Sequence, residues 1–535
     1  MFLLLVLVAA CTDSKGPLSG DSGDDSGCDS GVESSSDNNG DNSIDNSSGN
    51  IDTGRELPPF MTQGDGEEVI LFTTDNFRFT NAVLRSMYVT KSADYMWVSQ
   101  DINEQGNTVS GEWDSRASSA TVITIDPDKW FQQIDGFGAS FTDSSAYLIN
   151  QVLPRDVRDD LMIKLFHPID GIGLSFVRNP MGASDFARFI YSYNDIPEGE
   201  TDFDLEHFSI DHDRKDIIPL VKKALELNPD LKLVASPWSP PAWMKSTGSM
   251  IGGYLRHNCY NVYGDYFIRF LEEYRKEGIE FYGITPQNEP LYVPHHYPGN
   301  SMSREAQVNF INQSLGPKLR EHFPDVKLWC YDHNWDVTDY PEYVLRYAGE
   351  YVDGVAWHVY GGSPDAQTKV LKQFPDSEVH FTEASGGEWV PPFDAAFFGN
   401  IWVSIEVLNN HSRSVVLWNL ALDENNGPVV PGFGNSTCRG VVKIDQQTNE
   451  LTYNLDYYAL AHFSKYIHSG AVRVGSEING SSVFATACLN ADGSLVIVAL
   501  NDAPGNRTIH FDVGDFSFYY NAEAKSVVTI VIDLS

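Results

Sequence analysis

The pattern of apolar and polar positions divides the folded part of the chain into three segments. Residues 67–125 contain short alternating runs, such as VILFT at 69–73 and ATVITI at 120–125, which are typical of strands. From about residue 131, apolar runs of strand length alternate with longer segments of helical period. Short alternating runs return after residue 458. The pattern therefore predicts two β-rich segments with an α/β segment between them.

The middle segment contains enough strands and helices for a closed barrel. Strands are predicted at 133–139, 173–178, 231–236, 281–285, 326–331, 354–359, 379–382 and 414–418. Helices are predicted at 215–227, 263–278, 303–323, 340–351 and 460–467. Eight strands with intervening helices predict a (β/α)8 (TIM) barrel over residues 126–460. We expect residues 67–125 and 461–535, which share a strand pattern, to build one β-sandwich beside it.

Two of the predicted barrel strands end on a glutamate. The strand at 281–285 leads to Asn288, Glu289 and Pro290, and Pro290 favours an extended backbone at Glu289. The strand at 379–382 ends at Glu383, which small residues follow. The carboxyl ends of parallel strands meet at one face of a barrel, where a glycosidase needs two carboxylates. Either glutamate alone fits a structural ion pair, but the two together favour catalysis.

The first residues predict export and a lipid anchor. Residues 1–10 are almost wholly apolar, end in VAA and precede Cys11, which resembles the lipobox of a bacterial lipoprotein signal. This run is too short for an ordinary membrane span. We expect a signal peptide at 1–11 with Cys11 lipidated; a plain signal peptide with an incidental cysteine is the alternative. Residues 12–57, rich in Ser, Gly, Asp and Asn, predict a disordered tether that holds the folded part off a bacterial outer membrane or cell surface.

Charge and cysteine content narrow the choice of partners. The formal net charge of -38 argues against nucleic acid and anionic membrane surfaces as partners and fits a neutral substrate. No two of the six cysteines have metal-ligand spacing. Cys330 and Cys488 fall in predicted strands and are expected to be buried thiols. The predicted loop positions of Cys259 and Cys438 allow a disulfide between them.

Several motifs of the barrel segment occur together in a characteristic order. They are DGFGASFTD at 135–143, RNPMGASDF at 178–186, ASPWSPPAWMK at 235–245, TPQNEP at 285–290, His358 with Tyr360, TEA at 382–384 and WNLAL at 418–422. In order and spacing they resemble glycoside hydrolase family 30, which includes the acid β-glucosidase that cleaves glucosylceramide. The resemblance extends from about residue 67 to the end of the chain. The fold of that family, a barrel with a β-sandwich, agrees with the one predicted from the pattern.

The resemblance implies a role for each matching residue. Glu289 is the implied general acid/base and Glu383 the implied nucleophile. Residues implied to hold the sugar are Asp185, Trp238, Asn288 and Trp418, and those implied to surround the nucleophile are Arg178, His358 and Tyr360. Trp238 and Trp418 also fit a purely core role. We expect Asp135 and Asp143 to be turn and network residues rather than sugar ligands.

The implied chemistry is a retaining hydrolysis. It places the two carboxyl groups roughly 5 to 5.5 Å apart and requires Glu289 to start protonated, with its pKa raised by apolar surroundings and by the neighbouring carboxylate. Glu383 has to be ionised, and we expect Arg178 and Tyr360 to keep it so. Neither a metal nor an organic cofactor is expected, and we expect a monomer.

The substrate is less closely specified than the reaction. Loops at 295–298, 388–389 and 427–440 are expected to shape the aglycone side. We expect β-glucosides, either a β-1,6-glucan or a glucosylated lipid such as glucosylceramide. One alternative is a β-xylosidase or β-fucosidase, which would show an altered subsite around Asp185 and Trp238. Another is a non-catalytic surface glycan-binding protein, against which the intact pair Glu289 and Glu383 argues.

Overall fold

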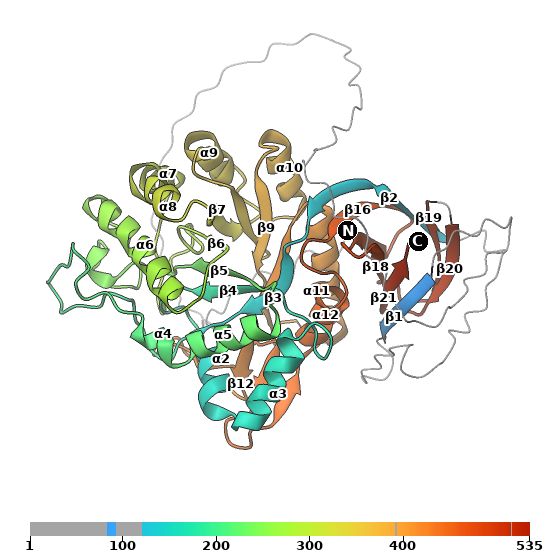
Figure 1. Cartoon of the computed structure of the whole chain (residues 1–535), viewed down its shortest axis with the longest axis horizontal. Coiled ribbons are helices and arrows are strands. Elements are labelled where there is room, and N and C mark those ends of the chain that lie inside the picture. Colours follow the sequence, from blue (N-terminus) through green and yellow to red (C-terminus); the bar gives the residue numbers. More distant parts are fainter. Residues whose placement is uncertain (1–82, 92–119, 391–392, 515, 535) are drawn as a thin grey trace, which may run out of the picture.

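The computed structural model describes residues 83–91, 120–390, 393–514 and 516–534 (Figure 1). The expected signal peptide at 1–11, the tether at 12–57 and the strand at 69–73 lie outside the described residues and stay predictions. None of the helices in the described ranges has the length and apolar character that crossing a membrane requires.

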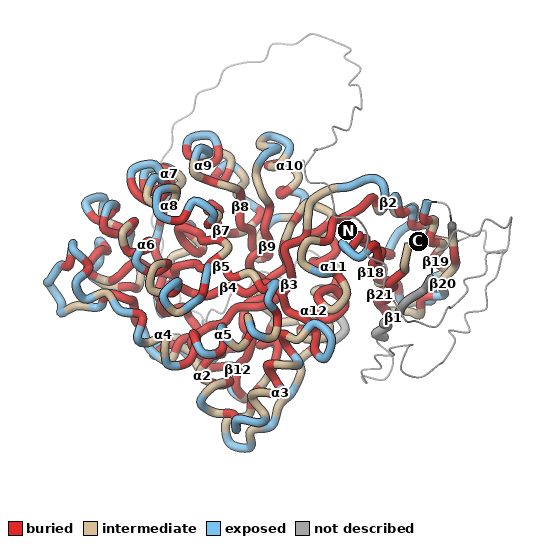
Figure 2. The backbone as a smooth tube through the Cα atoms, viewed as in Figure 1, coloured by how far each residue is buried: buried red, intermediate tan, exposed pale blue. Residues whose placement is uncertain are grey.

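The middle of the chain forms a closed barrel of eight parallel strands, as predicted. In order these are β3 (Gly136–Ser140), β4 (Phe176–Pro180), β5 (Lys232–Ser236), β6 (Gly283–Ile284), β7 (Lys327–Asn334), β8 (Gly354–His358), β9 (Glu378–Glu383) and β11 (Ser414–Asn419). The barrel closes where β11 pairs with β3. Most strand residues are buried (Figure 2). Side chains fill the inside of the barrel, and helices cover its outside.

Helices surround the barrel. They are α2 (Asp143–Tyr147), α3 (Arg155–Phe166), α4 (Asp211–Lys215), α5 (Ile217–Leu227), α6 (Tyr260–Lys276), α7 (Arg304–Phe310), α8 (Gly316–His322), α9 (Asp339–Ala348), α10 (Asp365–Gln373), α11 (Phe393–Asn409) and α12 (Leu455–Ser464). The helix expected at 303–323 is α7 and α8 joined by a π-helical turn, Ile311–Leu315. Ser303 caps it, its side chain accepting a hydrogen bond from the backbone N–H of Ala306.

Side chains inside the barrel form layers because residues alternate along each strand. Phe176, Val234, Trp329, Ala356 and Val416 pack together as an apolar middle layer. Two residues further along four of these strands lie Arg178, Ser236, His358 and Trp418, at the carboxyl end of the barrel. The alternation therefore places these four side chains in one layer inside the barrel, at its carboxyl end.

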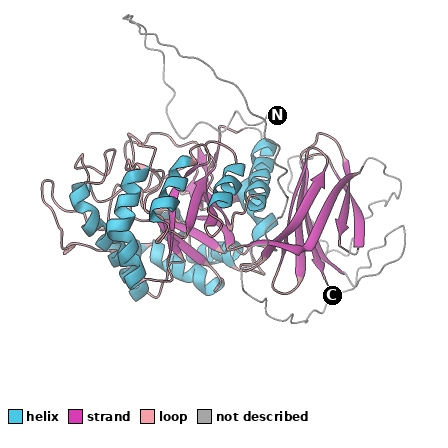
Figure 3. Ribbon diagram, turned by 90° about the horizontal axis from the view of Figure 1, so that it is seen from above, coloured by secondary structure: helices cyan, strands magenta, loops and turns pink. Residues whose placement is uncertain are grey.

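A second sheet lies beside the barrel (Figure 3). Its eight strands follow the order β1 (Val83–Lys91), β21 (Ser526–Asp533), β18 (Ser494–Asn501), β17 (Val483–Leu489), β16 (Val472–Asn479), β2 (Thr121–Gln133), β19 (Arg507–Val513) and β20 (Phe516–Ala522). Two strands that precede the barrel, β1 and β2, thus pair with strands that follow it. Alternate apolar residues of β2 and of β16–β21 share one core.

Strand β18 joins the two domains, since all of its residues are buried. Leu495 and Ile497 point into the core of the sheet domain, whereas Val496 and Val498 belong to the core of the barrel. Helices α11 and α12 of the barrel pack against β17, β18 and β21. The sheet domain therefore supports the barrel from one side.

The loops after β9 and β11 are tied together over the carboxyl end of the barrel. There β10 (Gly386–Gly387) pairs with β13 (Cys438–Arg439). Strand β14 (Val442–Ile444) pairs with β12 (Ala421–Asp423) on one side and with β15 (Leu451–Tyr453) on the other.

The four described cysteines are buried thiols, which confirms the expectation for Cys330 and Cys488. The disulfide considered for Cys259 and Cys438 does not form. Cys259 packs in the barrel core at the start of α6, and Cys438 packs beside Trp238 and Trp418.

Candidate active site

Glu383 lies at the carboxyl end of β9 and is nearly buried. Arg178 Nη1 donates a hydrogen bond of 2.6 Å to Glu383 Oε2, and Tyr360 Oη donates one of 2.9 Å to Oε1. The structure thus places Arg178 and Tyr360 around Glu383. A carboxylate held by a guanidinium and a phenol has a fixed direction and is favoured in its ionised form.

Glu289 follows β6 in a turn rather than at the end of an extended strand. Its φ is +45°, so our expectation of an extended backbone before Pro290 is wrong. The reason is tertiary: the backbone N–H of Glu289 donates to the carbonyl of Asp332 at 3.0 Å and holds the turn against β7. A non-glycine residue in this region carries backbone strain, which the surrounding structure has to hold.

Asp332, which sequence reasoning missed, is the centre of the site. Strand β7 has a bulge between Tyr331 and His333, and both Tyr331 and Asp332 have positive φ. The bulge turns the fully buried Asp332 side chain into the barrel. Its carboxylate accepts hydrogen bonds from Arg178 (2.9 Å), Ser236 (2.6 Å), Thr285 (2.7 Å), Thr382 (2.7 Å) and His358 (3.0 Å). Its place directly after the predicted strand at 326–331 was the available signal.

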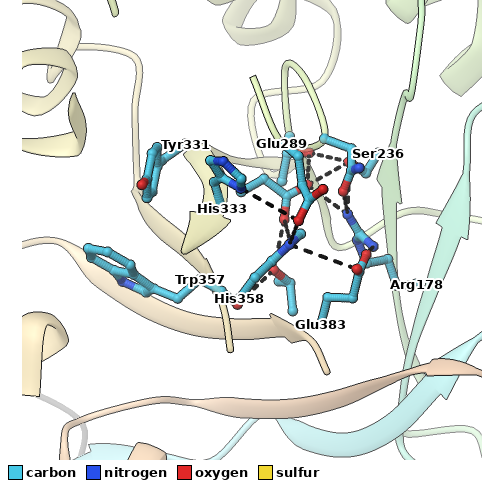
Figure 4. A network of polar contacts seen from close by, with 12 residues as sticks. Arg178, Ser236, Glu289, Tyr331, His333, Trp357, His358 and Glu383 are labelled. Carbon is cyan, nitrogen blue, oxygen red and sulfur yellow. Dashed lines mark hydrogen bonds and ion pairs between the residues drawn. The ribbon is translucent and has the colours of Figure 1, made fainter. Parts of the chain in front are cut away.

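One imidazole connects the two glutamates (Figure 4). His358 Nδ1 lies 3.2 Å from Glu289 Oε1 and 3.9 Å from Glu383 Oε1. His333 Nδ1 lies 3.5 Å from the same oxygen of Glu289. The structure therefore brings Glu289 and Glu383 together, as predicted, and adds His333, which sequence reasoning did not single out.

The histidines reverse the expected charge of Glu289. Burial lowers the pKa of His358, but the charge of Glu383 and hydrogen bonds to Asp332 and Glu289 outweigh it and raise this pKa to about 9. Burial raises the pKa of Glu289, yet its contacts with His333 and His358 outweigh burial and hold it below its usual value. In the free site the proton thus lies on His358, and our expectation of a raised Glu289 pKa is wrong.

The nucleophile candidate is subject to opposing influences. Burial raises the pKa of Glu383 above its ordinary value, while the charges of His358 and Arg178 act in the opposite direction. The sequence could not reveal these effects because the partners come from strands far apart in the chain.

The two tryptophans form one wall of the site. The rings of Trp238 and Trp418 stack with centroids 4.8 Å apart and an interplanar angle of 19°. The Arg178 guanidinium lies 4.8 Å from the centroid of Trp238. Phe186 and Cys438 pack in the same cluster. Both tryptophans are therefore packed and, at the same time, next to the arginine that holds Glu383.

Asn288 and Asp185 also adjoin the centre. Arg178 Nη2 donates a hydrogen bond of 2.6 Å to Asn288 Oδ1. Burial, followed by the charges of Asp185 and of the two glutamates, raises the pKa of Tyr297 well above its usual value. The charges of all three carboxylates thus act on Tyr297, which belongs to the loop at 295–298 expected on the aglycone side.

Asp135 and Asp143 lie in ion pairs, as expected for network residues. Asp143 accepts from Arg188 at 2.8 and 3.0 Å and lies 2.7 Å from His212 Nε2. Asp135 precedes β3, at the amino end of the barrel, and accepts from Arg413 at 2.8 Å.

Comparison with known proteins finds similar sequences and a similar structure that are named as endo-1,6-glucanases or as a glucosylceramidase. The endo-1,6-beta-D-glucanase of Neurospora crassa is 33% identical over 429 residues, covering 77% of this chain and 85% of that protein. The lysosomal acid glucosylceramidase of Mus musculus is 31% identical over 429 residues, covering 76% and 82%. A solved structure described as an endo-beta1,6-glucanase superposes with a TM-score of 0.75 at 29% identity, covering 84% of this chain and 99% of that one.

Family models account for both domains. Residues 134–467 match the glycosyl hydrolase family 30 TIM-barrel domain, and residues 470–530 match the beta sandwich domain of the same family. The barrel model alone spans more than half of the chain. The protein therefore belongs to glycoside hydrolase family 30.

Proposed function

We propose that this glycoside hydrolase cleaves β-glucosidic bonds by double displacement, with Glu383 as nucleophile and Glu289 as general acid/base. The observation that carries this proposal is the pair of carboxylates at the carboxyl end of the barrel, joined through His358. One of them is held by Arg178 and Tyr360, and the other faces two histidines. Two carboxylates with different surroundings suit two different roles.

In the first step Glu383 attacks the anomeric carbon and forms a covalent glycosyl-enzyme. The leaving oxygen needs a proton from Glu289 at this moment. That proton is supplied by His358, whose Nδ1 lies 3.2 Å from Glu289 Oε1. Glu289 passes it on to the leaving group. In the second step Glu289 takes a proton from the water that releases the sugar, and the configuration is retained.

The residues around the pair would position the sugar. Because Asn288 Oδ1 accepts from Arg178, its NH2 group is the donor left for the sugar 2-hydroxyl. A hydrogen bond to that hydroxyl strengthens in the transition state. The Trp238 and Trp418 pair would contact the apolar face of the ring, and Asp185 would accept from a hydroxyl.

We further propose a β-1,6-glucan as the substrate. An endo-1,6-glucanase stands among the similar sequences and among the similar structures. The formal net charge of -38 also disfavours approach to an anionic lipid surface, where a glucosylated lipid would be met. A soluble neutral polysaccharide carries no such penalty.

Export with a lipid anchor at Cys11 would suit this substrate. The apolar residues 1–10 followed by a cysteine, and the acidic residues 12–57, support anchoring of a monomeric enzyme on a tether at the cell surface. Metabolic labelling with a radioactive fatty acid tests this, and loss of label in Cys11→Ser is the expected result. Unchanged labelling of Cys11→Ser would disprove lipidation at this cysteine.

A time course on two substrates tests the function. Pustulan, a β-1,6-glucan, and glucosylceramide are incubated in parallel, and the products are separated by thin-layer chromatography, with Glu383→Gln as the control. Oligosaccharide release from pustulan alone is the expected result. Ceramide release alone would assign the enzyme to glucosylated lipids. An activated fluoroglucoside should in addition leave a covalent adduct on Glu383, and a peptide map without this adduct would refute the assigned nucleophile.

A further inference from the structure

We propose that Glu289, His333 and His358 form a binding site for a late divalent transition metal such as Zn²⁺, and that the bound metal inhibits the enzyme. Each residue offers one ligand atom, and the three atoms lie within 4.8 Å of one another. The two histidines are buried and come from the ends of neighbouring strands, β7 and β8. Rigid strands rather than flexible loops thus hold both imidazoles.

The distances fit a tetrahedral site. Bonds of about 2.0 to 2.2 Å from Zn²⁺ to nitrogen and oxygen put neighbouring ligands of a tetrahedron roughly 3.4 Å apart. His358 Nδ1 lies 3.2 Å from Glu289 Oε1, and His333 Nδ1 lies 3.5 Å from it. Two of the three ligand pairs therefore already have the required spacing. The third pair, the two histidine nitrogens, lies within 4.8 Å.

His333 supplies the second, independent observation. Its side chain is nearly buried, with 7% of the residue exposed, and its Nδ1 has no hydrogen-bond partner in the described part of the chain. Figure 4 shows the ring directed at Glu289. Buried polar atoms are normally hydrogen-bonded, so an imidazole nitrogen that lies 3.5 Å from a carboxylate oxygen without a hydrogen bond requires an explanation. A metal ion between the two atoms would provide it.

His358 is already oriented as a metal ligand. Its Nε2 donates to Asp332 Oδ1 at 3.0 Å, which leaves Nδ1 for the site. Asp332 is fixed in turn by Thr382 and Arg178. A carboxylate that holds the far nitrogen of a ligating histidine fixes the direction of the ring and makes it a better ligand.

The ligand set selects the kind of metal. Two imidazole nitrogens and one carboxylate oxygen suit Zn²⁺, Cu²⁺, Ni²⁺ and Co²⁺, whereas Mg²⁺ and Ca²⁺ prefer oxygen ligands alone. The fourth position faces Glu383, whose Oε1 lies 3.9 Å from His358 Nδ1. A water molecule or this oxygen can complete the tetrahedron.

Inhibition follows from where the metal sits. It would lie between His358 Nδ1 and Glu289 Oε1, which are 3.2 Å apart, and any proton on these ligand atoms would be released to solvent. The metal would then occupy the carboxylate that has to reach the leaving oxygen. The inhibitory effect rests on the proposed function, while metal binding as such does not.

Two variants test the inhibition in the full chain after treatment with a chelator. Hydrolysis of a chromogenic β-glucoside is measured against Zn²⁺ concentration, and each protein is compared with its own metal-free rate. We expect His333→Asn to raise the inhibition constant at least about 100-fold, since loss of an outer partner alone costs about 10- to 100-fold. The same change at the exposed His257 should leave it unchanged. Mg²⁺ should not inhibit.

A binding measurement separates this proposal from the proposed function. Co²⁺ absorption in the visible range and calorimetric titration report one bound ion per chain, whether or not any glucoside is hydrolysed. We expect His333→Asn and His333→Gln to lose this ion while their circular dichroism matches that of the wild type. Equal Zn²⁺ inhibition of the wild type and these variants would overturn the proposal. Relief of inhibition by Cys438→Ser would also overturn it, because the ion would then sit on that thiol.

Discussion

At each end of the barrel a buried aspartate accepts hydrogen bonds from an arginine and lies near a buried histidine. At the carboxyl end these residues are Asp332, Arg178 and His358. At the amino end they are Asp135, Arg413 and His380, with His380 Nε2 3.8 Å from Asp135. The apolar middle layer separates the two groups, with His380 stacked on Trp329 at 3.7 Å between ring centroids.

The two ends differ in charge balance and in backbone strain. At the amino end Asp135 and Glu378 are matched by Arg413, Lys232 and Lys327. At the carboxyl end the carboxylates of Asp332, Glu289 and Glu383 share Arg178 and His358 as cationic partners. Glu289 and Asp332 also have positive φ. Balanced charges suit a structural role, whereas excess negative charge and a strained backbone are typical of a functional site.

The largest expected difference in kcat is between substitutions of two glutamates in the same strand. Strand β9 begins at Glu378 and ends at Glu383. We expect Glu383→Gln to lower kcat at least about 10,000-fold, because the proposed nucleophile is lost. Glu378→Gln should leave kcat unchanged but reduce the free energy of unfolding by about 1 to 3 kcal/mol, since Trp329 and Lys327 lose an ionised partner.

Rate measurements and urea unfolding of both variants check this contrast. A loss of kcat in Glu378→Gln comparable with that in Glu383→Gln would show that the amino end takes part in catalysis. The division of roles between the two ends would then be wrong.

Asp332→Asn should damage both activity and stability. The amide has one acceptor oxygen where the carboxylate has two, and its NH2 group would face donors such as Ser236 and Thr285. We expect kcat to fall about 100-fold through misplacement of His358 and Arg178, and the free energy of unfolding to fall by about 3 to 5 kcal/mol. Steady-state kinetics and urea unfolding measure the two effects, and an active, stable variant would contradict the central role of Asp332.

Asp135→Asn should affect stability alone. The substitution leaves Arg413 without its anionic partner next to the buried side chain, which costs about 3 to 5 kcal/mol of unfolding free energy. No substrate contact is involved, so kcat per folded molecule should equal that of the wild type. Calorimetry measures the stability, and active-site titration counts the folded molecules. A lowered kcat under conditions where all molecules are folded would contradict the prediction.

The pH dependence of stability should also separate the ends. The folded pKa of His358, about 9, lies above its ordinary value of 6.5, so its stabilisation is complete below pH 6.5 and lost as the pH rises through 9. The loss is on the order of 3 kcal/mol. The pKa values of Asp135 and Glu378 are lowered, because their contacts with Arg413 and His380 outweigh burial. Their stabilisation is therefore lost in acid instead.

The comparison with His358→Gln isolates the alkaline effect. This control is needed because Lys245 has the opposite effect. Burial lowers its pKa to about 7 in the folded protein, so it makes the free energy of unfolding rise between pH 7 and its ordinary pKa of 10.5. Urea unfolding at pH 6 and pH 10 gives the difference between the two proteins. An equal change in wild type and variant would mean that His358 carries no stabilising charge.

Much of the barrel could be predicted from local patterns. Its strands appear as apolar runs because both of their faces are buried, so the barrel and the place of Glu289 and Glu383 at its carboxyl end were predictable. The same holds for residues that the family motifs mark, such as Arg178 and Tyr360, which the structure places on Glu383. Signals of this kind lie within a few neighbouring residues.

Asp332 shows what local patterns cannot supply. Counting by twos from the inward-facing Trp329 points to Tyr331 as the next residue inside the barrel. The bulge adds one residue, so Tyr331 packs outward against Tyr340 of α9 and Asp332 takes the inner position. Only contacts with other strands make such a bulge favourable, and these are not visible in the sequence of one strand.

The sequence by itself was enough to predict the order of the barrel strands, the two glutamates at the carboxyl end and the hydrolysis proposed for them. Hydrophobic periodicity and motif residues are local properties, so they can be recognised without the fold. Only the tertiary structure decided the turn at Glu289, the reduced thiols of Cys259 and Cys438, and the directions in which the pKa values of Glu289 and His358 shift. Each of these depends on distances between residues far apart in the chain: Glu289 meets Asp332 and His358 through strands β7 and β8. The pKa of a buried group follows from such partners, so it is fixed when the barrel closes.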